Sequence, residues 1–136
     1  MLQLTAEQMD ELIAHARESY PLECCGIIAG SGTRIEQLVR IPNTIESPVE
    51  YKMDDAAVKS ALDMLDAARL DFLGVYHSHP KSAAYPSNSD TAKAPFPELD
   101  YVIISLIDIE KPVIKNFSID NNVIIEEPLE IIFTNT

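Results

Sequence analysis

Positive charge is scarce in this chain. Its 136 residues include 10 Lys and Arg against 22 Asp and Glu, which gives a formal net charge of -12. Proteins that bind phosphate backbones or anionic lipid surfaces instead carry clustered Lys and Arg. The composition therefore argues against a nucleic acid or a membrane as partner, and a cationic protein surface suits this charge better.

The chain also has little cysteine and no long apolar run. Cys24 and Cys25 are adjacent, which does not suit a disulfide framework, so we expect free thiols in a reducing compartment. Thiolates could bind zinc, but a free cysteine is more often a small buried hydrophobic residue. No stretch resembles a secretory leader or reaches the length of a membrane span. The sequence therefore predicts a cytoplasmic protein, and its length suits a single domain of residues 1–136.

Capping patterns predict where the helices begin. Thr5, with Gln8 three residues later, forms a capping box ahead of a helix whose apolar side chains recur at the helical period. In that helix His15 lies among charged neighbours, and we interpret it as a solvated side chain. Asp54 predicts the start of a second helix. Residues 87–94 favour a short third helix that ends before the prolines that follow.

Short apolar runs between turn residues predict the strands of a mixed sheet. The tail after Pro128 is apolar and predicts either a last strand or a contact within a homodimer. The order of elements favours an α+β fold, because it lacks the strict alternation and the glycine fingerprint of a dinucleotide-binding fold. The predicted strands are residues 25–29, 34–41, 72–76, 101–107, 113–119 and 123–125.

Two histidines at the end of a predicted strand suggest a metal site. Residues i and i+2 of a strand point to the same face, so His77 and His79 can reach one ion while Ser78 points away. Asp90 can return from the following loop to supply an oxygen. Three protein ligands leave one tetrahedral position for water, which is typical of a catalytic zinc, and zinc lowers the pKa of that water strongly.

A zinc hydrolase also needs a group that carries a proton to the leaving amine, and a glutamate suits this task. Spacing alone does not select one glutamate, but Glu23 is the best placed because it leads into a predicted core strand. Ser87 could donate its hydroxyl to a developing oxyanion. The pair Ser87 and Asp90 is also a capping box, so both interpretations of Ser87 remain open.

These residues together resemble a known motif. Glu23, the segment His-Ser-His-Pro at 77–80 and the segment Pro-Ser-Asn-Ser-Asp at 86–90 look like the JAMM motif of MPN-plus metalloproteases. As in that family, seven residues separate the second histidine from the serine, and two separate the serine from the aspartate. Residues 21–26 (PLECCG) are similar to the family's glutamate-bearing strand.

The resemblance implies a curved mixed sheet flanked by helices, the layered arrangement of JAMM/MPN and deaminase-like proteins. It implies one Zn²⁺ bound by His77, His79 and Asp90, with water as fourth ligand and nucleophile. It further implies that Glu23 is the general acid and base and that Ser87 stabilises the tetrahedral intermediate. The short chain looks most like the compact stand-alone bacterial members. That resemblance implies a peptidase or isopeptidase acting at the C-terminal tail of a ubiquitin-like sulfur-carrier protein.

Two other functions remain open from the sequence. One is a non-catalytic scaffold of MPN type, although inactive relatives typically lose metal ligands and this chain keeps them. The other is a zinc amidohydrolase or deaminase acting on a small molecule. The chain lacks the Cys-x-x-Cys pair that ligates zinc in nucleobase deaminases.

Overall fold

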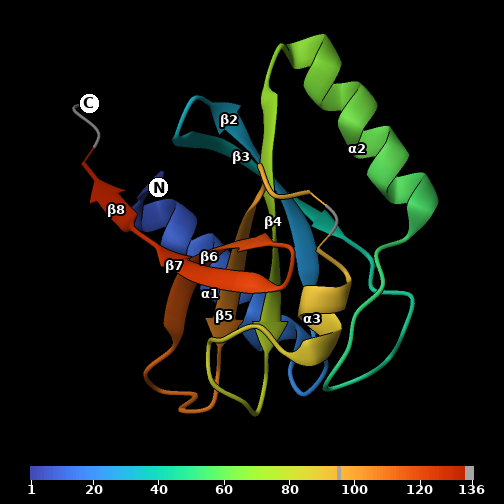
Figure 1. Cartoon of the computed structure of the whole chain (residues 1–136), viewed down its shortest axis with the longest axis vertical. Coiled ribbons are helices and arrows are strands. Elements are labelled where there is room, and N and C mark those ends of the chain that lie inside the picture. The colour runs from blue at the N-terminus through green and yellow to red at the C-terminus, as the bar shows by residue number, and fades with distance from the viewer. Residues whose placement is uncertain (95, 134–136) are drawn as a thin grey trace.

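The computed structural model describes residues 1–94 and 96–133, and this part of the chain contains eight strands and three helices (Figure 1). No helix among these residues is long and apolar enough to cross a membrane. In chain order the elements are β1 (Leu2–Thr5), α1 (Ala6–Ser19), β2 (Cys25–Ser31), β3 (Arg34–Ile41), α2 (Asp55–Ala68), β4 (Asp71–His79), α3 (Asn88–Ala92), β5 (Asp100–Ser105), β6 (Val113–Asp120), β7 (Val123–Glu127) and β8 (Leu129–Ile132).

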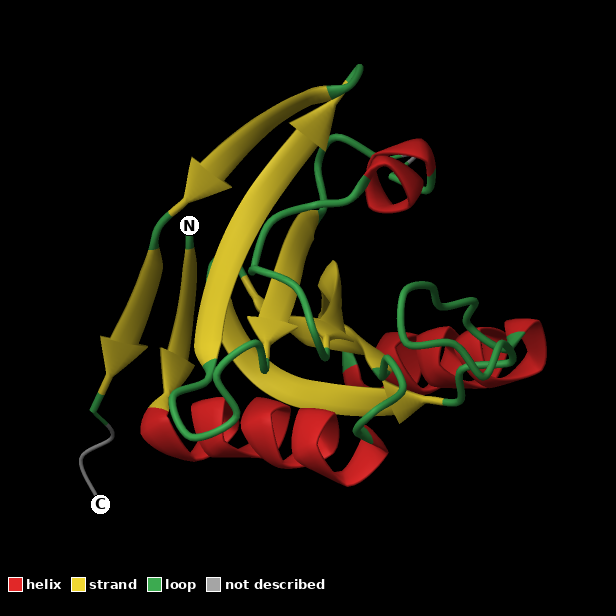
Figure 2. Ribbon diagram, turned by 90° about the horizontal axis from the view of Figure 1, so that it is seen from below, coloured by secondary structure: helices red, strands yellow, loops and turns green. Residues whose placement is uncertain are grey.

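The strands form one mixed sheet in the order β7-β6-β5-β4-β2-β3-β1-β8. Pairing is parallel between β4 and β5 and on both sides of β1, and antiparallel elsewhere. Figure 2 shows the sheet strongly curved, with α1 on one face and α2 and α3 on the other. The predicted α+β fold with a curved mixed sheet is confirmed.

The helices begin where the capping patterns predict. The Thr5 hydroxyl accepts a hydrogen bond from the Gln8 amide at 3.1 Å, and the Gln8 side chain accepts one from the Thr5 amide at 2.9 Å. Asp54 caps α2 by accepting from the Ala57 amide at 3.0 Å. Each cap satisfies amides that a helix start leaves without partners, so local sequence fixes the entry points of α1 and α2.

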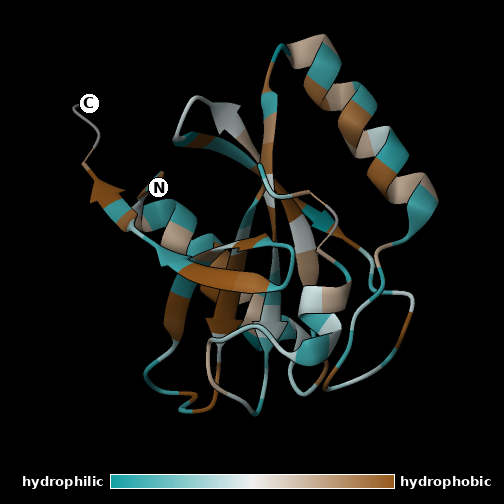
Figure 3. Cartoon of the chain, in the orientation of Figure 1, coloured by the Kyte–Doolittle hydropathy of each residue, from teal (hydrophilic) through white to brown (hydrophobic). Residues whose placement is uncertain are grey.

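Each face of the sheet has its own core, because alternate residues of a strand point to opposite faces. On β2, Ile28 packs in the cluster under α1, whereas Ile27 and Ala29 pack in the cluster under α2. In Figure 3 hydrophobic and hydrophilic residues alternate along α2, as expected for a helix with one buried face. The two cores hold β2 and its neighbour β4 rigidly in the middle of the molecule.

The prediction that His15 is a solvated side chain is wrong. His15 is only 9% exposed, and its Nδ1 lies 2.7 Å from the Tyr76 hydroxyl. The helical period explains this position, because residues 12, 15 and 16 share the face of α1 that covers the sheet. The pKa of His15 is lowered to about 4, chiefly by burial and also by the nearby Arg40, while Glu18 acts in the opposite direction.

No pattern in the sequence indicates β1, which precedes the capping box directly. Its pairing explains why a strand forms there: Leu2 and Leu4 are fully buried, and β1 lies between β3 and β8. The apolar tail is a last strand, β8, which runs parallel to β1. The predicted homodimer contact through this tail stays a prediction.

Candidate metal centre

The two histidines lie at the end of β4, between β2 and β5. His77 is opposite Cys25 on β2 and Ile103 on β5, so this strand end is fixed from both sides. Both imidazoles are buried, with 2% of His77 and 3% of His79 exposed. Ser78 points to the opposite face, where its hydroxyl accepts a hydrogen bond from the Cys24 amide at 2.8 Å. The predicted alternation along this strand is therefore confirmed.

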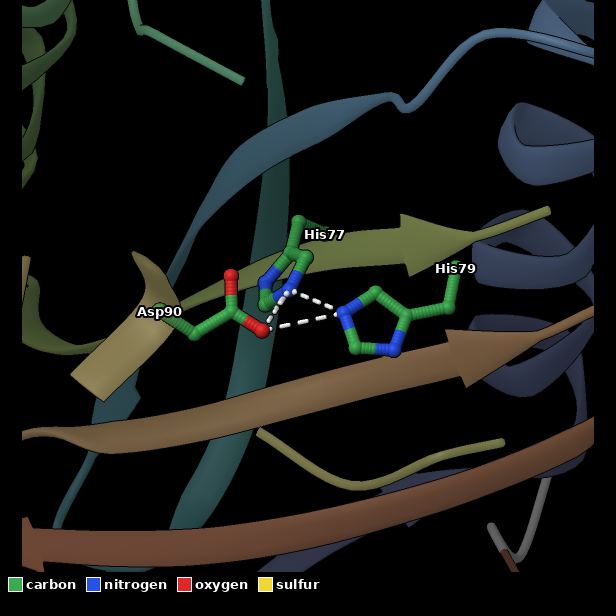
Figure 4. Close-up of side chains that lie close together, drawn as sticks. All are labelled: His77, His79 and Asp90. Atoms are coloured by element: carbon green, nitrogen blue, oxygen red, sulfur yellow. Dashed lines mark hydrogen bonds and ion pairs between the residues drawn. The ribbon is translucent and has the colours of Figure 1, made fainter. Parts of the chain in front are cut away.

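Asp90 reaches the histidines from α3. The Ser87 hydroxyl caps this helix by accepting from the Asp90 amide at 3.1 Å, and Asp90 Oδ2 accepts from the Ser87 amide at 2.8 Å. The same Oδ2 lies 3.1 Å from His77 Nε2 and 3.0 Å from His79 Nε2. Figure 4 shows the three side chains converging, two from β4 and one from α3. The capping box thus aims the carboxylate at the imidazoles.

This group offers a suitable set of metal ligands. One ligand atom from each of His77, His79 and Asp90 lies within 4.8 Å of the others, and all three residues are buried. His79 Nδ1 is 2.8 Å from the Ala83 carbonyl, to which it donates, so the lone pair of the neutral ring is on Nε2, toward the site. Two imidazole nitrogens and one carboxylate oxygen are a ligand set that zinc accepts. The residues present therefore fit a zinc ion.

The charges of the three side chains are strongly coupled. Burial alone would raise the pKa of Asp90, but its interactions with His77 and His79 hold it well below its usual range. Burial lowers the pKa of His77. For His79 burial is the largest single effect and lowers the pKa, but the hydrogen bonds with Asp90 and the Ala83 carbonyl and the charges of Asp90 and Glu23 together outweigh it, so the pKa is raised. The site thus holds an ionised carboxylate beside a neutral His77, which are the protonation states that ligate metals.

Glu23 lies just before β2 with its side chain buried. Only 4% of the residue is exposed, and its Oε1 has no hydrogen-bond partner among the described residues. Burial raises the pKa of Glu23 to about 8, with His79 lowering it and Asp90 raising it. A buried carboxyl oxygen without a partner is costly, so it points to a missing polar group at this position. The carboxyl is therefore available for chemistry beside the three ligands.

No pattern in the sequence indicates Tyr51 and Lys93, which border the ligand group. The Tyr51 ring stacks on His77, with 4.6 Å between the ring centroids and 27° between the planes. Lys93 Nζ donates to the Tyr51 carbonyl at 2.6 Å and lies 5.3 Å from the centroid of the Tyr51 ring. Tyr51 comes from the connection between β3 and α2, so no pattern near the histidines could have indicated it.

The two cysteines do not join the ligand group. Both are free and buried, as predicted, and burial raises the pKa of Cys24 to about 11 and that of Cys25 to about 12. Cys25 Sγ donates to the Ile41 carbonyl at 3.4 Å. Both side chains are therefore neutral parts of the core.

An apolar pocket of about 680 Å³ adjoins the site through Tyr51. Loop residues, α2 and β4 contribute to its walls, with Lys93 at one side. Its apolar lining includes Met53, Val58, Leu62, Phe72 and Leu99. Tyr51 therefore separates the ligand group from a space large enough for a bulky side chain.

Comparison with known proteins places the chain in a family. Residues 5–120 match the prokaryotic homologs of the JAB domain. The CysO-cysteine peptidase of Mycobacterium tuberculosis is 31% identical over 135 residues, which are 97% of this chain and 92% of that protein. The desampylase of Haloferax volcanii is 34% identical over 111 residues, which are 76% of this chain and 80% of that protein.

Solved structures agree with these sequence matches. A Desulfitobacterium hafniense protein solved in solution has a TM-score of 0.88 at 36% identity, over 96% of this chain and 92% of that one. A JAB1/MPN domain protein from Archaeoglobus fulgidus shares the fold, with a TM-score of 0.64 at 16% identity over 96% of this chain and 97% of that one. The chain therefore belongs to the family of prokaryotic homologs of the JAB domain, which confirms the resemblance to JAMM/MPN proteins, and it is a hydrolase of the peptidase type.

Proposed function

We propose that the chain is a zinc-dependent peptidase that hydrolyses an amide bond at the C-terminal tail of a ubiquitin-like, sulfur-carrier type protein. One observation carries the proposal: three buried ligand atoms converge, and the buried carboxyl of Glu23, which interacts electrostatically with His79 and Asp90, has an oxygen without a partner among the described residues. The names of the relatives, CysO-cysteine peptidase and desampylase, support this substrate class. We assign the activity to a single cytoplasmic domain of residues 1–136.

In this proposal His77 Nε2, His79 Nε2 and Asp90 Oδ2 hold the metal. When bound, zinc supplies a Lewis acid that polarises the scissile carbonyl and lowers the pKa of water. The chain's own contribution is to fix three ligand atoms on two rigid elements, β4 and α3, before the metal arrives. The capping box of α3 sets the direction of Asp90, and the Ala83 carbonyl sets the tautomer of His79.

Glu23 carries the proton in this proposal. A general acid and base works best when its pKa lies near the working pH, and burial raises the pKa of Glu23 to about 8. Its carboxyl can therefore take a proton from the attacking water and give it to the leaving amine.

Ser87 has two compatible tasks. Its oxygen accepts the hydrogen bond from the Asp90 amide, which uses a lone pair and leaves the hydroxyl hydrogen available. Among the described residues no hydrogen bond from this hydroxyl to an acceptor is found. The hydroxyl can therefore cap α3 and at the same time donate to the oxyanion of a tetrahedral intermediate.

The test combines metal analysis with cleavage. We expect one zinc per chain, and we expect carrier proteins extended beyond Gly-Gly to be trimmed at that point, as read by mass spectrometry. Glu23→Gln should lower kcat at least ~100-fold, the lower range for loss of general acid and base catalysis. Glu46→Gln, at an exposed loop position, is the matched control and should retain activity.

Two results would reject the proposal. One is a protein with no stoichiometric zinc, and the other is a Glu23→Gln variant as fast as the wild type. Zinc binding with partner binding and no cleavage would instead support a scaffold of the same fold.

A further inference from the structure

The connection between β3 and α2 holds part of the site although none of its residues is a proposed ligand. Residues 42–53 leave β3 and pass beside α3 before α2 begins (Figure 1). Two contacts place this loop against α3 and its end: Lys93 Nζ to the Tyr51 carbonyl at 2.6 Å, and the Ser89 hydroxyl to Glu50 Oε1 at 3.5 Å. The loop therefore borders the ligand group.

Asn43 organises this loop through its side-chain amide. Its Oδ1 accepts from the Ile45 amide at 3.0 Å and from the Lys52 amide at 2.9 Å. Its Nδ2 donates to the Glu23 carbonyl at 3.1 Å and to the Glu50 carbonyl at 3.4 Å. An amide side chain has two donor hydrogens and two acceptor lone pairs, so all of its hydrogen-bonding capacity is used.

Hydrogen bonds from the loop of residues 42–53 hold the main chain of Glu23. The Glu23 carbonyl accepts from Asn43, and the Glu23 amide donates to the Ser47 carbonyl at 3.0 Å. Both main-chain polar groups of Glu23 are therefore bound by this loop and not by a strand. Glu23 Oε1 has no hydrogen-bond partner among the described residues, so the hydrogen bonds that position Glu23 are the main-chain bonds to this loop.

The side-chain amide of Asn43 also holds the segment around Tyr51. Asn43 binds the Glu50 carbonyl and the Lys52 amide, the main-chain groups on either side of Tyr51. The Tyr51 ring stacks on His77, and its carbonyl accepts from Lys93, three positions after Asp90. A single side chain thus connects Glu23 with the residue that packs on a proposed ligand.

We propose that Asn43 is a positioning residue that sets the distance between the Glu23 carboxyl and the ligand group, by binding the Glu23 carbonyl and the segment around Tyr51 together. The inference rests on the proposed function, because it assumes that Glu23 acts at this site. Asn43 acts through these contacts, because all of its side-chain hydrogen-bonding capacity is used by Glu23 and the loop. Its loss should therefore change the rate of the chemical step more than the binding of the substrate.

Two substitutions separate the parts of this role. Asn43→Asp keeps acceptor oxygens for the Ile45 and Lys52 amides but loses the donor to the Glu23 and Glu50 carbonyls. Asn43→Ala removes all four hydrogen bonds and adds no charge. If both variants have the same effect on kcat and on the Glu23 signal, the negative charge introduced by Asn43→Asp is not the cause of that effect. Thr44→Ala is the matched control, because it removes a hydrogen bond from the same loop to the Lys52 carbonyl without touching Glu23.

The readouts are kcat and KM for a Gly-Gly extended carrier, zinc content, and the NMR signal of the Glu23 side-chain carboxyl carbon, assigned by its absence in Glu23→Gln. We expect both Asn43 variants to lower kcat roughly 10- to 100-fold, the scale for displacement of a catalytic group by about 1 Å. KM and zinc content should stay close to wild type, and the Glu23 signal should shift. Thr44→Ala should resemble the wild type in all four readouts: kcat, KM, zinc content and the Glu23 signal.

Several outcomes would overturn the inference. One is a folded, zinc-loaded Asn43→Asp or Asn43→Ala protein with wild-type kcat and an unshifted Glu23 signal. Another is an equal loss of kcat in Thr44→Ala. Failure of both Asn43 variants to fold while Thr44→Ala folds would also count against it, because Asn43 would then support the whole fold. If the wild type cleaves no carrier, the proposed function fails, and the NMR comparison still decides the role of Asn43.

Discussion

The buried His15 predicts how the stability of the protein depends on pH. Its imidazole has an ordinary pKa of 6.5 in the unfolded chain and about 4 in the folded one. Between these values the unfolded chain binds more protons, so the free energy of unfolding falls as the pH falls. The contribution of neutral His15 is complete above pH 6.5 and is lost progressively down to pH 4.

The magnitude follows from the two pKa values. A shift from 6.5 to about 4 corresponds to about 3 kcal/mol once both states are protonated, at ~1.4 kcal/mol for each pH unit. Between pH 7 and pH 5 the same values give a loss of about 2 kcal/mol. This is a large part of the stability of a domain of this size.

The assay compares the wild type with His15→Gln. The substituted glutamine side chain is neutral at every pH and can still exchange a hydrogen bond with the Tyr76 hydroxyl. Urea unfolding of both proteins at pH 7, 6 and 5, in a chelator so that metal release does not contribute, gives the difference in free energy. The ionisable groups of the ligand site are the same in both proteins, so their contributions cancel in this difference.

The wild type should lose about 2 kcal/mol relative to His15→Gln between pH 7 and pH 5. A difference that stays constant within about 0.5 kcal/mol, near the precision of such extrapolations, would refute the reasoning. A difference that grows in the other direction would mean that the folded state prefers charged His15, which would contradict the burial argument.

Three further predictions concern the site and the core. Ser87→Ala should lower the free energy of unfolding by about 1 kcal/mol through loss of the helix cap and lower kcat on a carrier fusion ~100-fold or more through loss of an oxyanion donor. Unchanged kcat would leave the hydroxyl with the capping role alone. Removal of zinc by a chelator should abolish cleavage and lower Tm, with both restored by added zinc, and cleavage by protein shown to be metal-free would contradict this. Gly26→Ala should lower stability by about 1–3 kcal/mol in a thermal melt, because a Cβ there would lie 2.2 Å from the buried Tyr76 ring; an unchanged Tm would show that the ring can move.

The features that the sequence predicts well are those determined by residues close together in the chain. The caps at Thr5, Asp54 and Ser87 depend on residues three apart, and all three are present in the structure. The pair His77 and His79 lies on one face because a strand alternates, which requires no knowledge of other elements. Such features are determined within a few residues of chain, so they can be read directly.

What the sequence predicts poorly depends on distant partners. β1 is only four residues long, and it is a strand because β3 and β8 pair with it. The hydrogen-bond partner of the buried His15 is a tyrosine 61 positions later. In the same way Tyr51 and Asn43 become neighbours of the site only through the path of a loop. No short-range pattern contains this information, because the energy that fixes these positions comes from tertiary packing.

The parallel ladder between β1 and β8 has a consequence for how the molecule is made. It joins residues 127 positions apart, and in one of these pairs the Gln3 side chain also donates a hydrogen bond to the Glu130 side chain. During synthesis β1 emerges first, yet one of its two neighbours emerges near the end of the described chain. The edge of β1 that pairs with β3 can form hydrogen bonds once β3 has been synthesised. The opposite, outer edge stays unpaired until β8 has been synthesised. Until then β1 is an open edge strand, the kind of surface that pairs with other chains. While β8 is absent, the outer edge of β1 is therefore a surface at which another chain can add and start aggregation.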